Sequence, residues 1–256
     1  MIAWTEAEKT VLPWALIFIV IFSIVVCVLT AKKDNKIKRI PLMIISVIIL
    51  GLEITKQIIN IINGYSLWSI PLHFCSLFLY LFPLASFFSD KLGNFGKTMS
   101  FVCGTLFLVL FYFNPSSIIG NSCANVFVSF STFHTFIYHH FIILFLLILL
   151  GSKLYLPSKY DFLHVFIGIT LYALIAVPLA HILNVNFCSL LTNVIPFMEE
   201  LRLATGQVVY TIVMYLVGVG GGFVAVGIAN LIKFLIIKGK QKDNFKIIMR
   251  ILKTRG

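Results

Sequence analysis

Residues 12–31 read LPWALIFIVIFSIVVCVLTA, an apolar run without a charged side chain. A helix of about 20 apolar residues is long enough to cross the hydrocarbon core of a bilayer. Glu6 and Glu8 precede the run instead of a basic region, and it lacks a small-residue cleavage pattern. We therefore interpret it as a retained transmembrane helix and not as a signal peptide.

Similar stretches fill most of the remaining chain. They cover about 40–62, 68–88, 98–113, 127–150, 161–183 and 205–236. The composition agrees, because 60% of the residues are hydrophobic and only 11% are charged, whereas soluble domains are roughly 45–50% apolar. The predicted fold is an all-α membrane protein of seven transmembrane helices, with a membrane domain over 1–237 and a basic tail over 238–256.

Positive charge alternates between the predicted connections. Every Lys and Arg except Lys9, Lys56 and Arg202 lies at 32–39, 89–97 or 151–160, or in the tail from Lys233. Cytoplasmic loops carry the excess of Lys and Arg, so the pattern predicts an N-terminus outside and a C-terminus in the cytoplasm. The net charge of +11 then belongs to a membrane surface, since a nucleic-acid binder gathers its charge on one folded face. The tail suits either an amphipathic helix on the inner leaflet or a solvated segment.

Ionisable side chains inside a membrane are costly and are candidates for function. Glu53, Lys56 and Asn60 are three and four residues apart in the second stretch, which places them on one helix face. They can form a structural ion pair or take part directly in a site.

The third stretch begins with Ser69 and continues through Ile70-Pro71-Leu72-His73-Phe74-Cys75. On a regular helix His73 and Cys75 would differ by about 200° in direction. If Cys75 is a nucleophile, its base must then come from another helix; otherwise it is an inert, buried cysteine.

The fifth stretch contains His134, His139 and His140, whose directions differ by roughly 100–140°. At most two of them can line one cavity, which disfavours a heme or metal centre. His140, Cys75 and Glu53 would each lie about 12–14 Å from the outer helix ends. They could therefore meet in the outer half of the bilayer, and His134 replaces His140 if the helix starts nearer Phe127.

The five cysteines show neither a CxxC motif nor metal-ligand spacing, so no metal site is expected, and we expect no cofactor. Cys123 and Cys188 both fall in predicted outer connections and could form a disulfide.

The sequence at Ile70-Pro71-Leu72-His73-Phe74-Cys75 resembles the LPLHxC motif of the bacterial YwaF family, which is related to the animal transmembrane protein 164. Similar features are His139-His140 with the following apolar run, and the segment from Asn184 to Phe187. The resemblance implies cysteine-dependent acyl transfer between membrane lipids, with Cys75 as nucleophile and His140 as base. The setting that the resemblance implies is the plasma membrane of a bacterium. For that chemistry, Asn186, Ser76 or His73 could donate a hydrogen bond to the developing oxyanion.

Two functional classes are therefore open. The first is a lipid acyltransferase or acyl hydrolase with Cys75 and His140 at its centre, whose partners are phospholipids or lyso-lipids. The second is a transporter or small-ligand-binding membrane protein in which Glu53, Lys56 and the histidines, His134 and His139 among them, bind a substrate or relay protons. A transporter should tolerate replacement of Cys75, whereas a thioester enzyme should not.

Overall fold

The computed structural model describes residues 4–193 and 195–253, with side chains described at 4–120, 122–193 and 195–238. In this part of the chain the regular structure is helical. The elements are α1 (Glu6–Thr30), α2 (Asn35–Ile62), η1 (Leu67–Ser69), η2 (Phe74–Leu77), α3 (Phe78–Phe87), α4 (Lys91–Phe113), α5 (Ser116–Ile119), η3 (Gly120–Cys123), α6 (Phe130–Gly151), α7 (Asp161–Leu183), η4 (Phe187–Ser189), α8 (Pro196–Thr205) and α9 (Gln207–Lys253).

The predicted all-helical membrane class is confirmed. Six helices are long and apolar enough to cross a membrane: α1, α2, α4, α6, α7 and the part of α9 over Gln207–Lys238. The third predicted crossing is instead a shorter apolar stretch, Phe74–Phe87. Large apolar side chains such as Phe18, which is 69% exposed, cover the outside of the bundle, as expected for a surface that lipid covers.

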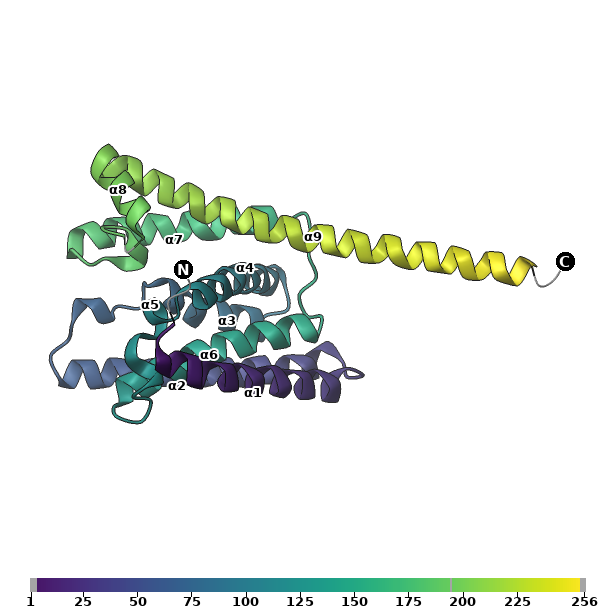
Figure 1. Cartoon of the computed structure of the whole chain (residues 1–256), viewed down its shortest axis with the longest axis horizontal. Coiled ribbons are helices and arrows are strands. Elements are labelled where there is room, and N and C mark those ends of the chain that lie inside the picture. Colours follow the sequence, from purple (N-terminus) through teal and green to yellow (C-terminus); the bar gives the residue numbers. More distant parts are fainter. Residues whose placement is uncertain (1–3, 194, 254–256) are drawn as a thin grey trace.

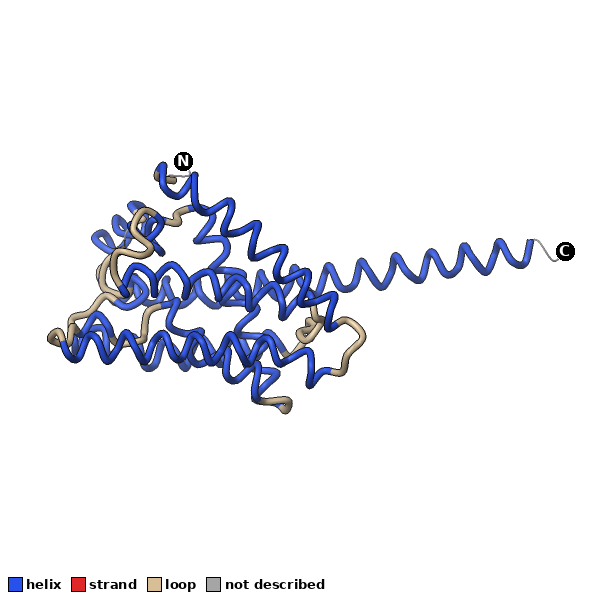
Figure 2. The backbone as a smooth tube through the Cα atoms, turned by 90° about the horizontal axis from the view of Figure 1, so that it is seen from below, coloured by secondary structure: helices blue, strands red, loops and turns tan. Residues whose placement is uncertain are grey.

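The long helices run side by side in a bundle (Figure 1). α1 and α2 pack on α6, α3 packs between α2 and α4, and α4 also contacts α7 and α9. The turns between α1 and α2 and between α6 and α7 lie at the end where α9 leaves the bundle, and α5 and α8 lie at the other end, which we call the α8 end. α9 continues far beyond the bundle as one helix (Figure 2). The predicted amphipathic face of the tail lies outside the side chains that the structure describes.

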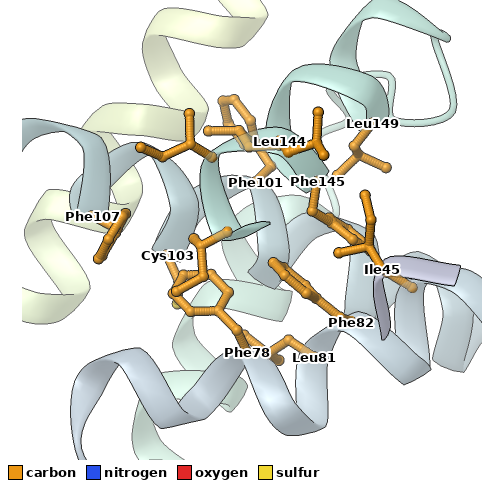
Figure 3. Packing of buried hydrophobic residues seen from close by; sticks show 14 of the residues in the cluster. Ile45, Phe78, Leu81, Phe82, Phe101, Cys103, Phe107, Leu144, Phe145 and Leu149 are labelled. Carbon is orange, nitrogen blue, oxygen red and sulfur yellow. The ribbon is translucent and has the colours of Figure 1, made fainter. Parts of the chain in front are cut away.

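Aromatic side chains fill the centre of the bundle (Figure 3). Phe82 of α3 stacks on Phe145 of α6 with ring centroids 3.6 Å apart, and Phe78 packs edge-on against Phe107 of α4. Because these rings are almost completely buried, they fix the rotation of α6 relative to α3 and α4. That rotation decides which of its histidines face α2 and α3.

α7 begins with a buried polar network. Asp161, which is 3% exposed, accepts hydrogen bonds from Thr98 Oγ1 at 3.0 Å, Tyr155 OH at 2.8 Å and the Ser158 amide at 2.9 Å. A buried carboxylate is stable only when its oxygens are paired in this way. The network therefore joins α4, the loop before α7 and α7 itself.

We expect Gly96→Ala to destabilise the protein by about 2 kcal/mol, since overpacking a tight contact costs about 1–3 kcal/mol. A Cβ at Gly96 would lie 2.5 Å from the backbone nitrogen of Ala85, so α3 and α4 would have to separate. Thermal unfolding in detergent measures the change. Gly51→Ala is the matched control, because nothing lies within 4 Å of its added Cβ and Ala is the better helix former; equal losses in both variants would contradict the explanation.

Candidate functional site

The candidate site surrounds an interruption in the third apolar stretch. η1 ends at Ser69, the backbone is extended at His73 (φ −69°, ψ 158°), and helical structure resumes at Phe74. The prediction of a regular helix from Ser69 is therefore wrong, and the 200° separation of His73 and Cys75 does not apply. The physical reason is Pro71, which disfavours the α conformation at Ile70.

Side chains from several helices bond to carbonyl groups in and beside this interruption. The pairs are Gln57 Nε2 with Ser69 O at 2.7 Å, Tyr80 OH with Pro71 O at 3.4 Å, Tyr172 OH with Leu72 O at 2.7 Å, and Tyr138 OH with Cys75 O at 3.1 Å. An unpaired backbone group in a bilayer costs several kcal/mol. Donors from α2, α3, α6 and α7 thus hold the chain from Ser69 to Cys75, of which residues 70–73 are non-helical.

A charged cluster lies beside this segment, between α2 and α6. The Glu53 carboxylate, on a side chain 8% exposed, forms an ion pair with Lys56 Nζ at 2.7 Å and accepts a hydrogen bond from Gln57 Nε2 at 2.6 Å. His134 Nε2 lies 3.4 Å from its other oxygen, without forming a well-aligned hydrogen bond. The arrangement brings His134, which is distant in the sequence, next to Glu53 and Lys56.

The two other histidines of α6 bond within their own helix. His139 Nδ1 donates to Thr135 O at 2.7 Å, and His140 Nδ1 donates to Phe136 O at 2.6 Å. Since a carbonyl oxygen can only accept, the neutral rings carry their proton on Nδ1 and leave Nε2 free to act as a base. His140 Nε2 is buried without a hydrogen-bond partner.

The direction of each α6 side chain separates the three histidines. Tyr138, whose hydroxyl reaches Cys75 O, marks the face toward the third stretch. At 100° per residue His134 lies about 40° from Tyr138, His139 about 100° and His140 about 160°. His139 stacks on Phe107 and His140 packs edge-on against Phe111 of α4. Among the described residues, no hydrogen bond joins the Cys75 sulfur to a histidine.

Cys188 of η4 is a second thiol beside the interrupted segment. Its sulfur accepts a hydrogen bond from Tyr172 OH at 2.7 Å, lies 3.8 Å from Leu72 O and faces the amide of Phe74. Burial raises the pKa of the Cys188 thiol to about 12. Cys123 lies in η3, and both cysteines are free, so the disulfide considered from the sequence is not formed.

His73 and Asn186 are held in other ways. His73 Nε2 donates to Trp68 O at 3.0 Å, and its ring packs against Trp68 and Phe187. The Asn186 amide bonds to Thr192 O at 3.0 Å, and its oxygen accepts from the Leu191 amide at 2.8 Å. Asn186 therefore orders its own loop at the α8 end.

The comparison with protein families gives one match. A model described as the TMEM164 family covers residues 4–220. This chain belongs to the TMEM164 family. No curated protein and no solved structure matches it.

The match of the TMEM164 family extends from just before the first helix into the first third of α9 and includes the whole candidate site. Within this TMEM164-family chain, sequence reasoning missed Gln57, Tyr138, Tyr172 and Cys188. Hydroxyl groups of tyrosines inside apolar helices were the available signal, since a buried Tyr usually finds a hydrogen-bond partner.

Proposed function

We propose that the protein is an acyltransferase or acyl hydrolase that acts on membrane phospholipids through a thioester on Cys75. The observation that carries the proposal is the position of Cys75 directly after a non-helical segment, at a place where side chains of four helices bond to carbonyls between Ser69 and Cys75. Irregular backbone at membrane depth is tolerated where it is buried in protein or lines a cavity. Irregular backbone that is held by hydrogen bonds next to Cys75 supports a catalytic role for this cysteine.

The proposed topology has seven crossings, the third formed by Phe74–Phe87, with the N-terminus outside. The excess of Lys and Arg in the connections at the end where α9 leaves the bundle supports this orientation. Cys75 and Glu53 then lie in the outer half of the bilayer. We assign the chain to the bacterial YwaF branch and to the plasma membrane, on the strength of the Ile70–Cys75 motif.

The reaction would proceed in two steps. The Cys75 thiolate attacks the ester carbonyl of a donor phospholipid, a thioester forms, and the lyso-lipid leaves with a proton from the base. The hydroxyl of a lyso-lipid acceptor, or water, then attacks the thioester, gives its proton to the base and releases Cys75. Cys75 is the second residue of the helical stretch Phe74–Phe87, and the partial positive charge at a helix N-terminus favours a thiolate.

His134 is the base that the geometry supports best. It lies on the same face of α6 as Tyr138, whose hydroxyl bonds to Cys75 O. Its Nε2 faces the Glu53 carboxylate. A carboxylate that holds one side of an imidazole stabilises the imidazolium formed during proton transfer. His140 points away from this face, and His139 is intermediate.

We expect His134→Gln to lower the rate of thioester formation by about 100-fold or more, the usual contribution of general base catalysis, and His140→Gln to lower it by less than about tenfold. Single-turnover labelling of the protein with radioactive phospholipid measures both rates. Each variant should elute as a folded monodisperse species. A larger loss in His140→Gln than in His134→Gln would reverse the assignment of the base.

A transporter or ligand-binding protein is the second candidate. The Glu53–Lys56–His134 cluster favours it, because buried, ionisable side chains often bind ions or relay protons. This candidate gives Cys75 no chemical role.

Incubation of purified protein with phospholipid radiolabelled in its acyl chain tests the proposal. We expect a protein-bound label that neutral hydroxylamine releases and that peptide mass spectrometry assigns to Cys75. A folded protein that acquires no such adduct, with donor lipid and lyso-lipid acceptor supplied in turn, would favour the second candidate.

A further inference from the structure

The interruption before Cys75 coincides with the boundary between two apolar cores. Ile70 and Leu72 pack against a small cluster formed by α7 and the η4 loop, which includes Ala176 and Phe187. Phe74, Cys75 and Leu77 pack against the large core of the bundle. The chain therefore passes from one core to the other between Leu72 and Phe74, and Cys75 follows directly after this boundary.

Polar contacts join the two cores at this boundary. Tyr172 OH lies 2.7 Å from both Leu72 O and Cys188 Sγ, and Cys188 Sγ lies 3.8 Å from Leu72 O. A hydroxyl has one hydrogen to donate. When Tyr172 donates it to Cys188 Sγ, the Cys188 thiol donates in turn to Leu72 O, and when Tyr172 donates it to Leu72 O directly, Cys188 Sγ stays beside both oxygens. In both arrangements Tyr172 and Cys188 together hold the Leu72 carbonyl.

The backbone around Cys188 is adjusted to this set of contacts. Cys188 has φ 49° and Ser189 has φ 59°, a left-handed conformation that residues other than glycine seldom adopt. Such conformations persist where surrounding contacts over-determine them. The loop thereby places the Cys188 sulfur against Leu72 and the Phe74 amide, next to Cys75.

We propose that Tyr172, with Cys188 as its partner, is a positioning residue of the site. Its hydroxyl fixes Leu72 and thereby sets the direction in which the following turn presents the Cys75 thiol to the lipid ester. The inference rests on the proposed acyl transfer for its chemical consequence. The orientation of Cys75 can be measured without that activity.

Tyr172→Phe removes the hydroxyl and keeps the ring, and Tyr215→Phe is a matched control. The Tyr215 hydroxyl also forms a hydrogen bond of 2.8 Å, to Thr170 of α7, without contacting the third stretch. In Tyr172→Phe we expect N-ethylmaleimide to alkylate Cys75 about tenfold faster, as loss of one hydrogen bond allows. Peptide mass spectrometry follows Cys75 separately from the other cysteines.

Acylation is the second readout. At saturating phospholipid the rate of thioester formation in Tyr172→Phe should fall about tenfold, while the half-saturating lipid concentration stays unchanged. If the role of Tyr172 were purely structural, Tyr215→Phe would show the same faster alkylation of Cys75 and the same slower acylation. Cys188→Ala should accelerate alkylation of Cys75 several-fold, and Cys188→Ser, which retains a hydrogen-bonding group, should stay near the wild type.

The outcomes separate the two proposals. Unchanged alkylation and acylation in Tyr172→Phe, or equal changes in Tyr215→Phe, would overturn the positioning role. If the wild type forms no adduct, acyl transfer fails, and the alkylation rates still decide whether Tyr172 orients Cys75. If Tyr172→Phe does not fold, the contrast between Cys188→Ala and Cys188→Ser decides.

Discussion

We expect Cys75→Ala to abolish the hydroxylamine-sensitive adduct and to lower the proposed acyl transfer by at least about a thousandfold, because removal of a catalytic nucleophile typically costs several orders of magnitude. No neighbouring group replaces it easily. The Cys188 sulfur is engaged with Tyr172 OH and Leu72 O. Cys75→Ser should give, at most, a slow ester that neutral hydroxylamine does not cleave. Labelling with radioactive phospholipid, quantified per mole of protein, measures the adduct in the wild type, in Cys75→Ala and in Cys75→Ser.

Cys103→Ala is the matched control for this experiment. Cys103 of α4 is 3% exposed and packs in the same large core, so its loss perturbs packing to a similar extent without removing the proposed nucleophile. We expect a labelled adduct close to the wild-type amount. An adduct that persists in Cys75→Ala, or disappears equally in Cys103→Ala, would exclude Cys75 as the site of the thioester.

Most crossings could be predicted from the sequence because hydrophobic runs end at recognisable residues. The apolar run at 161–183 predicted a helix there, and α7 spans Asp161–Leu183. Asn184 follows in the left-handed conformation that ends a helix. α4 instead begins at Lys91, before the apolar run, since Asp90 caps it by bonding to the amides of Leu92 and Gly93. A hydropathy pattern does not register such polar caps.

The shape of the third stretch depends on tertiary contacts. Pro71 was a local signal for a break. The four side chains that bond to carbonyls between Ser69 and Cys75, however, come from positions between 57 and 172. Their convergence follows from the packing of the bundle. Without that packing, an apolar run that contains Pro71 and Pro83 was reasonably interpreted as a regular helix, since Pro83 does lie inside α3.

The candidate site was partly accessible to sequence reasoning for a related reason. Glu53 and Lys56 pair within one helix, so their spacing of three residues was sufficient. The choice among His134, His139 and His140 depends on the rotation of α6, which the stacking of Phe145 on Phe82 fixes. The directions of the three histidines relative to one another were predictable from the helix geometry, but the neighbouring helix that each histidine faces was not.

Glu53→Gln should destabilise the protein by about 3 kcal/mol. It leaves Lys56, whose side chain is only 23% exposed, without its anion and leaves His134 facing a neutral amide. Loss of one member of a buried pair costs about 3–5 kcal/mol, and the partial exposure of Lys56 places this pair at the lower end. Unfolding followed by tryptophan fluorescence in lipid nanodiscs, at increasing denaturant, measures the loss.

The double variant Glu53→Gln/Lys56→Met distinguishes pairing from a general need for Glu53. Replacing both members of a buried pair is often close to neutral, so the double variant should be more stable than Glu53→Gln alone. Glu6 and Lys9 form a control pair with the same spacing, 2.6 Å apart and largely exposed, and its loss should be barely measurable. If the double variant instead loses the sum of both single effects, Glu53 and Lys56 stabilise the bundle independently, and the ion pair between them contributes nothing.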